Sequence, residues 1–335
     1  MSARIKDVAE RAGVSVTSVS RVLNSEKYIS QQILDKVNQA IKELNYTPSQ
    51  IARSLKKQKT DTIGVIVPDL TNYFCSTILS IIEESASEYG YNLIVCNIAE
   101  NLDKELKYLH ALQEMRVDGI IIMHQKVDER ILSFIECATM PILFSCVRSP
   151  LQGRFSVLIN DYQAALDATE YLIGLGHRRI AFLGGDLEDV TAGYSRYQGY
   201  LDAMSKSAIP LIPDFIRFGN YKQESGRLMM QELLEQQERP TVVFAVSDDM
   251  AVGAMNCILD YGLRIPEDIS VMGFDDSLFA EAVRPMLTSM QQPVQELGRT
   301  SLEYLHNLIQ NGSQNGCKEV FLPHRIMERA SCRRI

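Results

Sequence analysis

Apolar residues at the start of the chain recur at helical spacing. They form three successive stripes: Ile5, Val8, Ala9 and Ala12; then Val19, Val22 and Leu23; then Ile33, Val37, Ala40, Ile41 and Leu44. Residues three and four apart share one face of a helix, so each stripe predicts a short amphipathic helix. Gly13 separates the first two helices, and Ser15 and Ser30 stand where the N-caps of the second and third are expected. The pattern predicts a headpiece of three helices that ends at residues 46–48, where a proline follows.

Beyond residue 60 the pattern changes to short apolar runs that alternate with helical stretches. The first set has runs at 63–67, 93–96, 119–123 and 142–146, with helical stretches at 73–89, 101–116 and 128–138. The second set has runs at 180–183, 215–218, 242–246 and 270–274, with helical stretches at 162–174, 193–206, 222–237 and 249–261. Runs that are apolar on both faces are typical of buried parallel strands. The alternation predicts two α/β lobes in tandem, with a ligand cleft outside the carboxyl ends of their strands.

Two segments depart from these patterns. Residues 48–60 are too few and too poor in apolar side chains to form a core, which predicts a linker that becomes helical only against a partner. Near the other end, the strand-like stretches 287–292 and 319–327 flank a helical stretch at 294–310. We interpret these segments as crossovers that join the two lobes.

The second short helix suggests a function. Thr17, Ser20, Arg21 and Asn24 fall on the side opposite its apolar stripe. Two short helices across a tight glycine turn, the second of which presents small polar groups and an arginine, are the helix-turn-helix pattern that enters a DNA major groove. An ordinary helical hairpin with a solvated face shows the same pattern, so the pattern alone leaves both interpretations open.

The distribution of charge favours DNA binding. Residues 1–60 hold 11 Lys and Arg against 5 Asp and Glu, a net charge of +6. Because the whole chain has a net charge of −8, the residues after 60 carry a net charge of −14. A basic head neutralises phosphates and gains from counterion release, whereas an acidic body is repelled by DNA. The charge asymmetry therefore supports the helix-turn-helix interpretation.

Composition sets the broad class of protein. A chain of 335 residues with 46% hydrophobic content can bury a large core and favours two or three domains. We find neither a signal peptide nor an apolar run of roughly 18 residues, which a bilayer requires, so we expect a cytoplasmic protein without membrane contact. The seven cysteines are widely spread, form no CxxC pair and are interpreted as reduced core residues.

Enzyme and metal-site interpretations find little support. Gly174 and Gly176 could begin a nucleotide fingerprint, but the pair precedes a strand and a third glycine is missing. The acidic pairs at 248–249 and 275–276 could suggest a metal site, yet helix capping and ligand anchoring explain them more simply. Because no nucleophile with a paired base is visible, we expect no enzyme activity, no metal and no cofactor.

Ordered motifs over nearly the whole chain carry a family resemblance. The head contains DVAERAGVSVTSVSRVLN, VNQAIKELNYTP and PSQIARSL; the body contains DGIII, LGHRRIAFLGG, SRYQGY, SDDMAVGAM, VMGFDD and LTSMQQP. In these motifs the chain resembles the lactose-repressor and galactose-repressor family of bacterial transcription regulators. The resemblance implies an all-α helix-turn-helix headpiece plus an α/β periplasmic-binding-protein-like core of two parallel-sheet lobes. It also implies a homodimer, a repressor rather than an activator, on a pseudo-palindromic operator of double-stranded DNA.

The resemblance also implies domain boundaries. The headpiece spans 1–47, the hinge 48–60 and the ligand-sensing core 61–335. Within the core, lobe one comprises about 61–159 and 293–317, and lobe two about 160–288 and 318–332. No leucine heptad follows Ile335, so we expect no tetramer.

The family's DNA contacts are carried over to matching positions. Val16 and Thr17 stand where the principal base-reading side chains lie, and Arg21 where an arginine reaches the groove. The backbone-contacting and hinge positions of the motif are Ser15, Ser20, Asn24, Tyr28, Ala52 and Leu55. Leu55 is the expected wedge that enters the minor groove and kinks the duplex, although without the family we would interpret it as a linker residue packed on the head.

The resemblance assigns the effector pocket in the same way. Tyr73, Phe74 and Tyr221 match ring-contacting positions, and Arg196 and Asp275 match polar anchors. Gln292, Ser247 and Asp248 are expected to complete the rim. Cys146 stands where many sugar-binding members place an acid, and a thiol cannot accept two hydroxyls as a carboxylate can.

The effector is expected to be small, but its identity stays open among a sugar, a sugar phosphate and a nucleobase. Val190 lies where the purine repressor uses an arginine, which weakens the nucleobase interpretation. An alternative is control mainly by a protein partner on the body, as in the family's catabolite-control branch.

Overall fold

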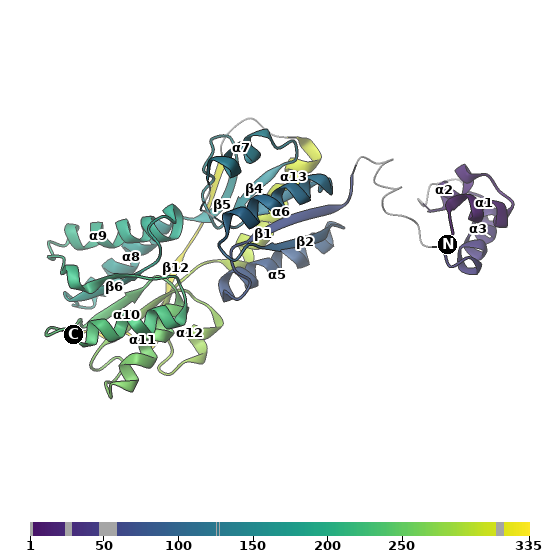
Figure 1. The fold of residues 1–335 in the computed structure, drawn as a ribbon. Coiled ribbons are helices and arrows are strands. Elements are labelled where there is room, and N and C mark those ends of the chain that lie inside the picture. Colours follow the sequence, from purple (N-terminus) through teal and green to yellow (C-terminus); the bar gives the residue numbers. More distant parts are fainter. Residues whose placement is uncertain (1–2, 24–28, 47–58, 125, 127, 313–317) are drawn as a thin grey trace. The chain divides into compact units, whose positions relative to one another are not determined.

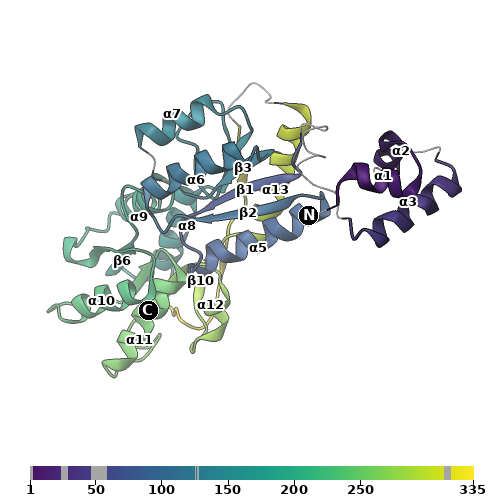
Figure 2. The ribbon, with the colours of Figure 1, turned by 45° about the vertical axis from the view of Figure 1, so that its right-hand side comes forward.

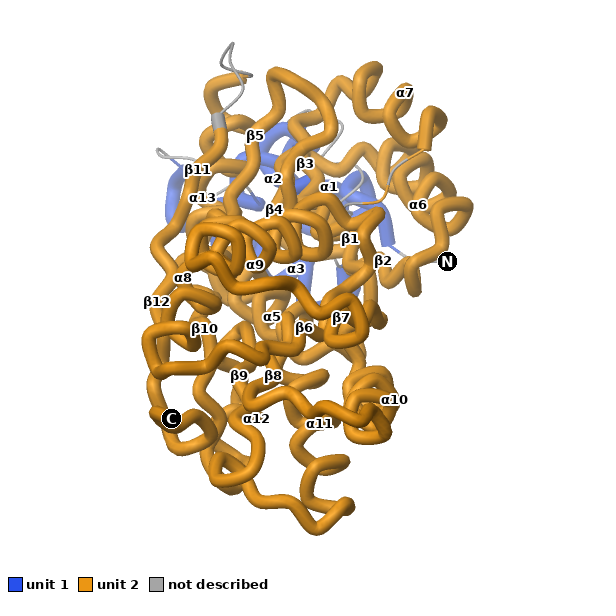
Figure 3. The backbone as a smooth tube through the Cα atoms, turned by 90° about the vertical axis from the view of Figure 1, so that its left-hand side faces the viewer, with its two compact units in different colours: residues 1–61 blue, residues 62–335 orange. Residues whose placement is uncertain are grey.

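The structure is a computed structural model of residues 1–335 that describes residues 3–23, 29–46, 59–124, 126, 128–312 and 318–335. The chain forms two compact units, Met1–Asp61 and Thr62–Ile335, coloured separately in Figure 3. The first unit is the helical headpiece, and the second is the core with its two lobes (Figure 1).

The headpiece contains the three predicted helices, α1 (Ile5–Ala12), α2 (Val16–Leu23) and α3 (Gln31–Glu43). Their apolar stripes meet in one small core of buried residues: Val8, Ala9, Ala12, Val19, Val22, Val37 and Ala40. Gly13 ends α1 with a φ of 64°, a left-handed conformation that glycine adopts without strain. The side-chain oxygen of Ser15 accepts a hydrogen bond from the backbone N–H of Ser18 at 3.1 Å, as predicted for an N-cap. Ser30 occupies the N-cap position of α3, but its side chain makes no cap hydrogen bond, so that part of the prediction is wrong.

The first lobe is a six-stranded parallel sheet in the order β11-β5-β4-β3-β1-β2. Its strands are β1 (Thr62–Val67), β2 (Asn92–Asn97), β3 (Gly119–Ile122), β4 (Ile142–Ser145), β5 (Phe155–Ile159) and β11 (Lys318–Leu322). Helices α5 (Tyr73–Glu88) and α13 (Val294–Asn311) pack on one face of the sheet, in one apolar cluster. Helices α6 (Leu102–Glu114) and α7 (Glu129–Cys137) cover the other face in a second cluster (Figure 2). Helices on both faces explain why most of these strands are apolar throughout.

The second lobe repeats this plan with the strand order β12-β10-β9-β8-β6-β7. Its strands are β6 (Ile180–Gly184), β7 (Ile216–Phe218), β8 (Val242–Ala245), β9 (Ser270–Asp275), β10 (Thr288–Gln291) and β12 (Arg325–Met327). All pairs are parallel except β12 with β10. The helices are α8 (Asp161–Gly174), α9 (Ser195–Lys206), α10 (Gln223–Leu234), α11 (Asp248–Asp260) and the short α12 (Leu278–Ala282). One large cluster of buried residues forms the core of this lobe.

Several elements differ from the sequence prediction. The strand β5 and the helix α12 were not predicted. The stretch 319–327 is two strands in different sheets, because β11 pairs with β5 in the first lobe and β12 with β10 in the second. The assignment of residues 318–332 to the second lobe is therefore wrong for β11, whereas β12 does lie in the second lobe. The strands β2 and β7 lie at sheet edges and are only partly buried, unlike the fully buried strands expected.

Two expectations from composition can be compared with the described residues. The six described cysteines are all free thiols, as expected, but Cys137 is exposed and is not a core residue. No helix among the described residues is both long and apolar enough to span a membrane.

Candidate effector cleft and DNA-binding helix

Helix α2 presents the expected residues on its outer side. Its buried residues Val19 and Val22 hold one face against the headpiece core. Thr17 and Arg21 are exposed on the opposite side, and Val16, the first residue of the helix, is 40% exposed. Ser15 is exposed and caps the helix, and Ser20 is half-buried. Asn24, Tyr28, Ala52 and Leu55 lie outside the described residues, as does most of the predicted hinge.

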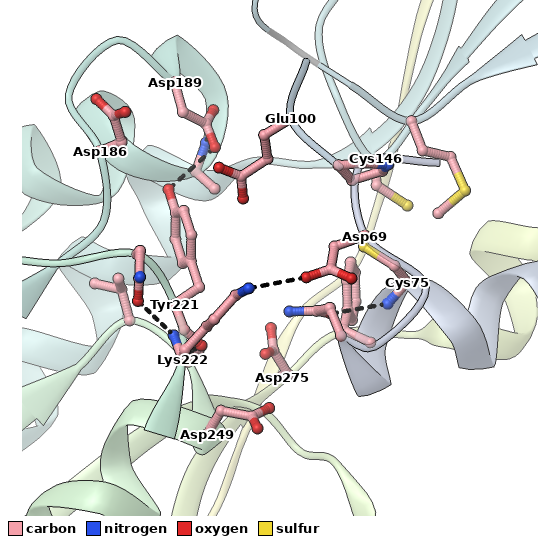
Figure 4. A pocket seen from close by; sticks show the side chains of 18 of the residues that line it. Asp69, Cys75, Glu100, Cys146, Asp186, Asp189, Tyr221, Lys222, Asp249 and Asp275 are labelled. Atoms are coloured by element: carbon pink, nitrogen blue, oxygen red, sulfur yellow. Dashed lines mark hydrogen bonds and ion pairs between the residues drawn. The ribbon is translucent and has the colours of Figure 1, made fainter. Parts of the chain in front are cut away.

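A cavity of about 440 Å³ lies in the core unit, where strand ends of both lobes meet (Figure 4). In the first lobe its lining follows β1, β2, β3 and β4: Pro68, Asp69, Thr71, Asn72, Phe74, Cys75, Glu100, Met123, His124, Lys126, Cys146 and Val147. In the second lobe it follows β6, β7, β8 and β9: Asp186, Asp189, Ala192, Arg196, Gly219, Asn220, Tyr221, Lys222, Gln223, Val246, Ser247, Asp249 and Asp275. Gln292 completes the lining from the segment between β10 and α13. The cleft therefore lies where parallel sheets bind ligands.

Most of the predicted pocket residues line this cavity. They are Phe74, Cys146, Arg196, Tyr221, Ser247, Asp275 and Gln292. Tyr73 does not: its ring packs against that of Phe279 in the other lobe, with 5.3 Å between the ring centroids. Asp248 does not either, because it is fully buried and accepts hydrogen bonds from Ser289 Oγ and the Ser277 backbone N–H, both at 2.6 Å. Placing these two side chains in the pocket was wrong, and contact of the other seven with effector remains a prediction.

Arg196 is fixed by its surroundings on the floor of the cleft. Its Nε lies 2.8 Å from Asp161 Oδ1, and its Nη1 donates to the Val246 carbonyl at 2.7 Å. The guanidinium also stacks over the Phe274 ring, 3.7 Å from the centroid. Burial raises the pKa of Asp161 to about 6, and the charge of Arg196 opposes that rise. An arginine held at this many points is preorganised for a polar ligand.

Asp275 ends β9 in a strained conformation at the centre of the cleft. Its φ is 111°, a region that L-residues rarely adopt, and such strain is concentrated at functional sites. Gln292 Nε2 donates to its Oδ1 at 2.8 Å. Burial raises the pKa of Asp275 well above its usual range, although the nearby charge of Arg196 opposes that rise. The chain therefore presents Asp275 to the cavity at an energetic cost.

Tyr221 forms the wall of the cleft in the second lobe. Its hydroxyl donates to Asp189 Oδ2 at 3.0 Å, and its carbonyl accepts from Ser247 Oγ at 3.2 Å. Burial raises the pKa of Tyr221, so the hydroxyl remains a donor. Gly185 leaves room for the ring, because a Cβ there would lie 2.1 Å from Tyr221 Cζ.

The wall in the first lobe is apolar and contains sulfur. Phe74, Cys75, Met123 and Cys146 line it together. Burial raises the pKa of Cys146 to about 12 and that of Cys75 further, so both thiols are neutral. Neutral thiols next to an aromatic ring form a surface for the less polar face of a ligand.

Sequence reasoning missed the charged residues that join the two lobes across the cleft. Lys126, after β3, pairs with Asp186, after β6, and its Nζ also lies 3.1 Å from Glu188 Oε2. Lys222, after β7, lies 3.1 Å from Asp69 Oδ2, after β1 (Figure 4). The hydrogen bond to Asp186 raises the pKa of Lys126. The position of each residue just after a predicted strand was the signal available in the sequence.

A buried histidine also lines the cavity without having been predicted. His124 Nδ1 lies 2.8 Å from Oε2 of Glu105, which has no solvent exposure. Val190, in contrast, is half-exposed and does not line the cavity. Because Val190 lies outside this lining, the absence of an arginine at that position does not decide between the ligand classes.

The comparisons with known proteins agree with this architecture. Residues 4–49 match the bacterial regulatory proteins of the lacI family, and residues 60–330 match the periplasmic binding proteins and sugar binding domain of the LacI family. Catabolite control protein A of Priestia megaterium is 37% identical over 331 residues, with 99% of each chain covered. The HTH-type transcriptional repressor PurR of Vibrio atlanticus (strain LGP32) is also 37% identical over 331 residues, with 98% of each chain covered.

Solved structures extend the similarity to the fold. The lac repressor dimer bound to operator and the anti-inducer ONPF has a TM-score of 0.90 and 30% identity, and the match covers 99% of this chain and 100% of that chain. The complex of the transcriptional regulator CelR with cellobiose has a TM-score of 0.75 and 29% identity, with 98% and 99% covered.

A helix-turn-helix headpiece together with a two-lobed core that contains a cavity with several charged side chains defines a DNA-binding transcription regulator with an effector-binding core. The chain belongs to the LacI family of bacterial regulatory proteins. The predicted fold class and family resemblance are thereby confirmed. Because the catabolite control protein and the PurR repressor are equally identical to this chain, the comparisons give the partner-controlled alternative no better support.

Proposed function

We propose that this protein is a homodimeric repressor that binds a pseudo-palindromic operator and responds to a small effector in the cleft. The observation that carries the proposal is that one chain contains both a DNA-reading helix and an inter-lobe cavity lined by Arg196, Asp275 and Gln292. The effector class stays among sugars, sugar phosphates and nucleobases. A regulator from Enterococcus faecium with bound ribose, 30% identical to this chain, supports that range.

The edge of the first sheet supports dimer formation. β2 is an edge strand in which Val95 is 41% exposed and Leu93 and Ile94 are only half-buried. An apolar edge strand invites association unless a partner covers it. We therefore place part of the dimer interface along β2, and a cytoplasmic dimer on DNA is consistent with the family.

The linker would couple the two units. Residues 48–60 lack apolar content for a core, and a helix this short is marginal in water, so we propose that they become helical only with operator and a second subunit. Effector and operator affinities would then be reciprocally linked. Hydrogen exchange on residues 48–58, with and without operator, tests the coupling; strong protection without DNA would contradict it.

The proposed function is tested in three measurements on the full-length protein. Selection of bound sequences from random DNA is expected to give a site with two inverted half-sites, and sedimentation to give a dimer. Thermal-shift screening of sugars, sugar phosphates and nucleobases is expected to yield a ligand that changes operator affinity. An operator without inverted symmetry, or DNA binding that responds to no ligand, would refute the corresponding part of the proposal.

A further inference from the structure

The charges in the cleft do not balance. Six carboxylates line the cavity, on Asp69, Glu100, Asp186, Asp189, Asp249 and Asp275. Three basic side chains face them, on Lys126, Arg196 and Lys222. At full ionisation these nine side chains carry a net charge of −3, and −2 when Asp275, whose pKa burial raises, is protonated.

Each basic side chain already has a partner in the protein. Arg196 binds the buried Asp161, which lies behind the lining. Lys126 pairs with Asp186 and Glu188, and Lys222 with Asp69. A phosphate or carboxylate on a ligand would have to share each cation with a carboxylate that already neutralises it.

Four of the six carboxylates, in contrast, lack a described cation within hydrogen-bonding distance. One of them, Asp189, is held by hydrogen bonds from the Tyr221 hydroxyl and two backbone N–H groups. The other three are Glu100, Asp249 and Asp275. Among the described residues, the side chains of Glu100 and Asp249 have neither a hydrogen bond nor an ion pair, and Asp275 has one bond, from the neutral Gln292 amide. Asp275 is 9% exposed, and its second oxygen, Oδ2, has no hydrogen-bond partner there. Burial raises the pKa of Asp249, as expected for a carboxylate without a counter-ion.

The three carboxylates approach the cavity from both lobes. Glu100 follows β2 in the first lobe, next to Ala99; both residues have positive φ, 57° and 50°, so the backbone is strained where it directs Glu100. Asp249 lies in the first turn of α11 and Asp275 at the end of β9, both in the second lobe. Figure 4 shows all three around one space. A cation between them would contact both lobes at once.

We propose that the effector carries a cationic group, such as the protonated amine of an amino sugar, which Glu100, Asp249 and Asp275 bind. Anionic ligands, phosphorylated sugars among them, are excluded by the same charges. The proposal rests on the proposed function insofar as this cavity is the effector site. It narrows that site's ligand class to amine-bearing polar molecules.

The cleft potential can be measured without knowing the effector, with thiol reagents of opposite charge. Asn220 lines the cavity and is exposed, so Asn220→Cys supplies a reporter, and the exposed native Cys137 on α7 supplies an internal reference. The free protein is treated with the cationic trimethylammonioethyl or the anionic sulfonatoethyl methanethiosulfonate, and labelling of each cysteine is followed by peptide mass spectrometry. We expect the ratio of cationic to anionic rates to be about tenfold larger at the reporter than at Cys137.

Charge variants identify the source of this preference. Glu100→Gln and Asp249→Asn should each lower the rate ratio at the reporter, whereas Glu303→Gln, on the exposed side of α13, should leave it unchanged. Ala192→Cys is a second reporter in the cavity lining if Asn220→Cys fails to fold. A ratio of cationic to anionic rates at the reporter that equals the ratio at Cys137, or is smaller, would overturn the proposal.

A matched ligand series tests recognition directly. Glucosamine, glucose and glucose 6-phosphate, and the corresponding galactose compounds, are compared by thermal shift and calorimetry. We expect an amine to bind at least about tenfold more tightly than its neutral parent, and the phosphate not to bind. A sugar phosphate or neutral sugar that binds as tightly as the corresponding amine would refute the proposal. If none of these sugars binds, the ratio of labelling rates at the reporter cysteine decides whether the proposal holds. Because both tests use free protein, they are independent of whether any ligand changes operator affinity.

Discussion

At the scale of single residues, the buried ionisable groups have quite different surroundings. His177 is fully buried, with Nδ1 2.9 Å from Thr241 Oγ1 and Nε2 3.2 Å from the Arg333 carbonyl oxygen. Burial lowers the pKa of His177 to about 4 from an ordinary value near 6.5. Arg196 and Asp161 are instead buried as an ion pair. The buried neutral histidine should make the free energy of unfolding depend on pH, and the buried ion pair should make it depend on the presence of both partners.

His177 should make stability depend on pH. Its folded-state pKa is depressed, so the stabilisation is complete above about pH 6.5 and is lost as the pH falls toward 4. The loss is about 3 kcal/mol for a shift of this size. Urea unfolding at pH 7 and pH 4.5 should therefore differ less in His177→Gln than in wild type. His110→Gln, at an exposed position, is the control and should keep the wild-type difference.

The Arg196–Asp161 pair should be costly to break from one side. Arg196→Met leaves the Asp161 carboxylate buried without its cation, so we expect a loss of roughly 3 kcal/mol in the free energy of unfolding. Replacing both, as Arg196→Met with Asp161→Asn, should recover most of that loss. Chemical denaturation of the single and double variants measures it. A double variant as unstable as the single one would show that the charge imbalance is not the cause.

At the scale of elements, local patterns predicted the fold where one segment determines its own structure. The three headpiece helices and most of the core strands could be read from apolar spacing because each buries its own stripe or run. The strand β5 was missed, although all of its residues are buried, because its run contains Ser156. The strands β11 and β12 follow one another in sequence yet join different sheets, and only long-range pairing decides that.

In the predicted site, too, local patterns place some residues, whereas the contacts between the two lobes decide others. Arg196 and Asp275, which a helix start and a strand end deliver to the cleft, line the cavity, and their contact with an effector stays a prediction. Tyr73 begins its helix next to the cleft, but contact with Phe279 of the other lobe takes its ring away. The inter-lobe pairs of Lys126 and Lys222 depend on how two sheets approach each other, which no local pattern contains.

A substitution on the exposed side of helix α2 should weaken DNA binding without lowering the stability of the protein. Arg21 is exposed on the side opposite Val19 and Val22, so Arg21→Ala should weaken specific operator binding by roughly 1–3 kcal/mol and leave the thermal midpoint nearly unchanged. Fluorescence anisotropy on specific and random DNA measures the change in affinity. Val19→Ala is the contrasting variant: because Val19 is fully buried, this change should lower the thermal midpoint as well as DNA affinity. Equal losses of folding and binding in Arg21→Ala would contradict the assignment.

At the scale of the whole molecule, three chain crossings and several side-chain contacts join the two lobes of the core. Among the described residues, the contacts across the cleft include the ion pairs of Lys126 and Lys222, the hydrogen bond from the Arg148 backbone N–H to Thr191 Oγ1, and the ring contact between Tyr73 and Phe279. Exposed ion pairs contribute at most about 1 kcal/mol each, so closure by these pairs is weak and can be shifted by a ligand.

Removing both lysines should open the core. In Lys126→Met with Lys222→Met, we expect a larger radius of gyration of the free protein by small-angle scattering, and the same change in wild type at high salt. Lys206→Met is the control, because Lys206 pairs with Glu170 within one lobe. Identical scattering of the double variant and wild type would show that the pairs do not hold the lobes.

The path of the chain between the lobes also affects synthesis. The chain passes from the first sheet to the second after β5, returns for α13 and β11, and crosses again to β12. Neither lobe is therefore complete on the ribosome until the last strands have emerged. β5 waits for β11 with one edge unpaired while β6 to β10 of the second lobe are being translated. The nascent chain must avoid aggregation through an exposed strand for almost half of its synthesis, a demand that a protein with sequential domains does not face.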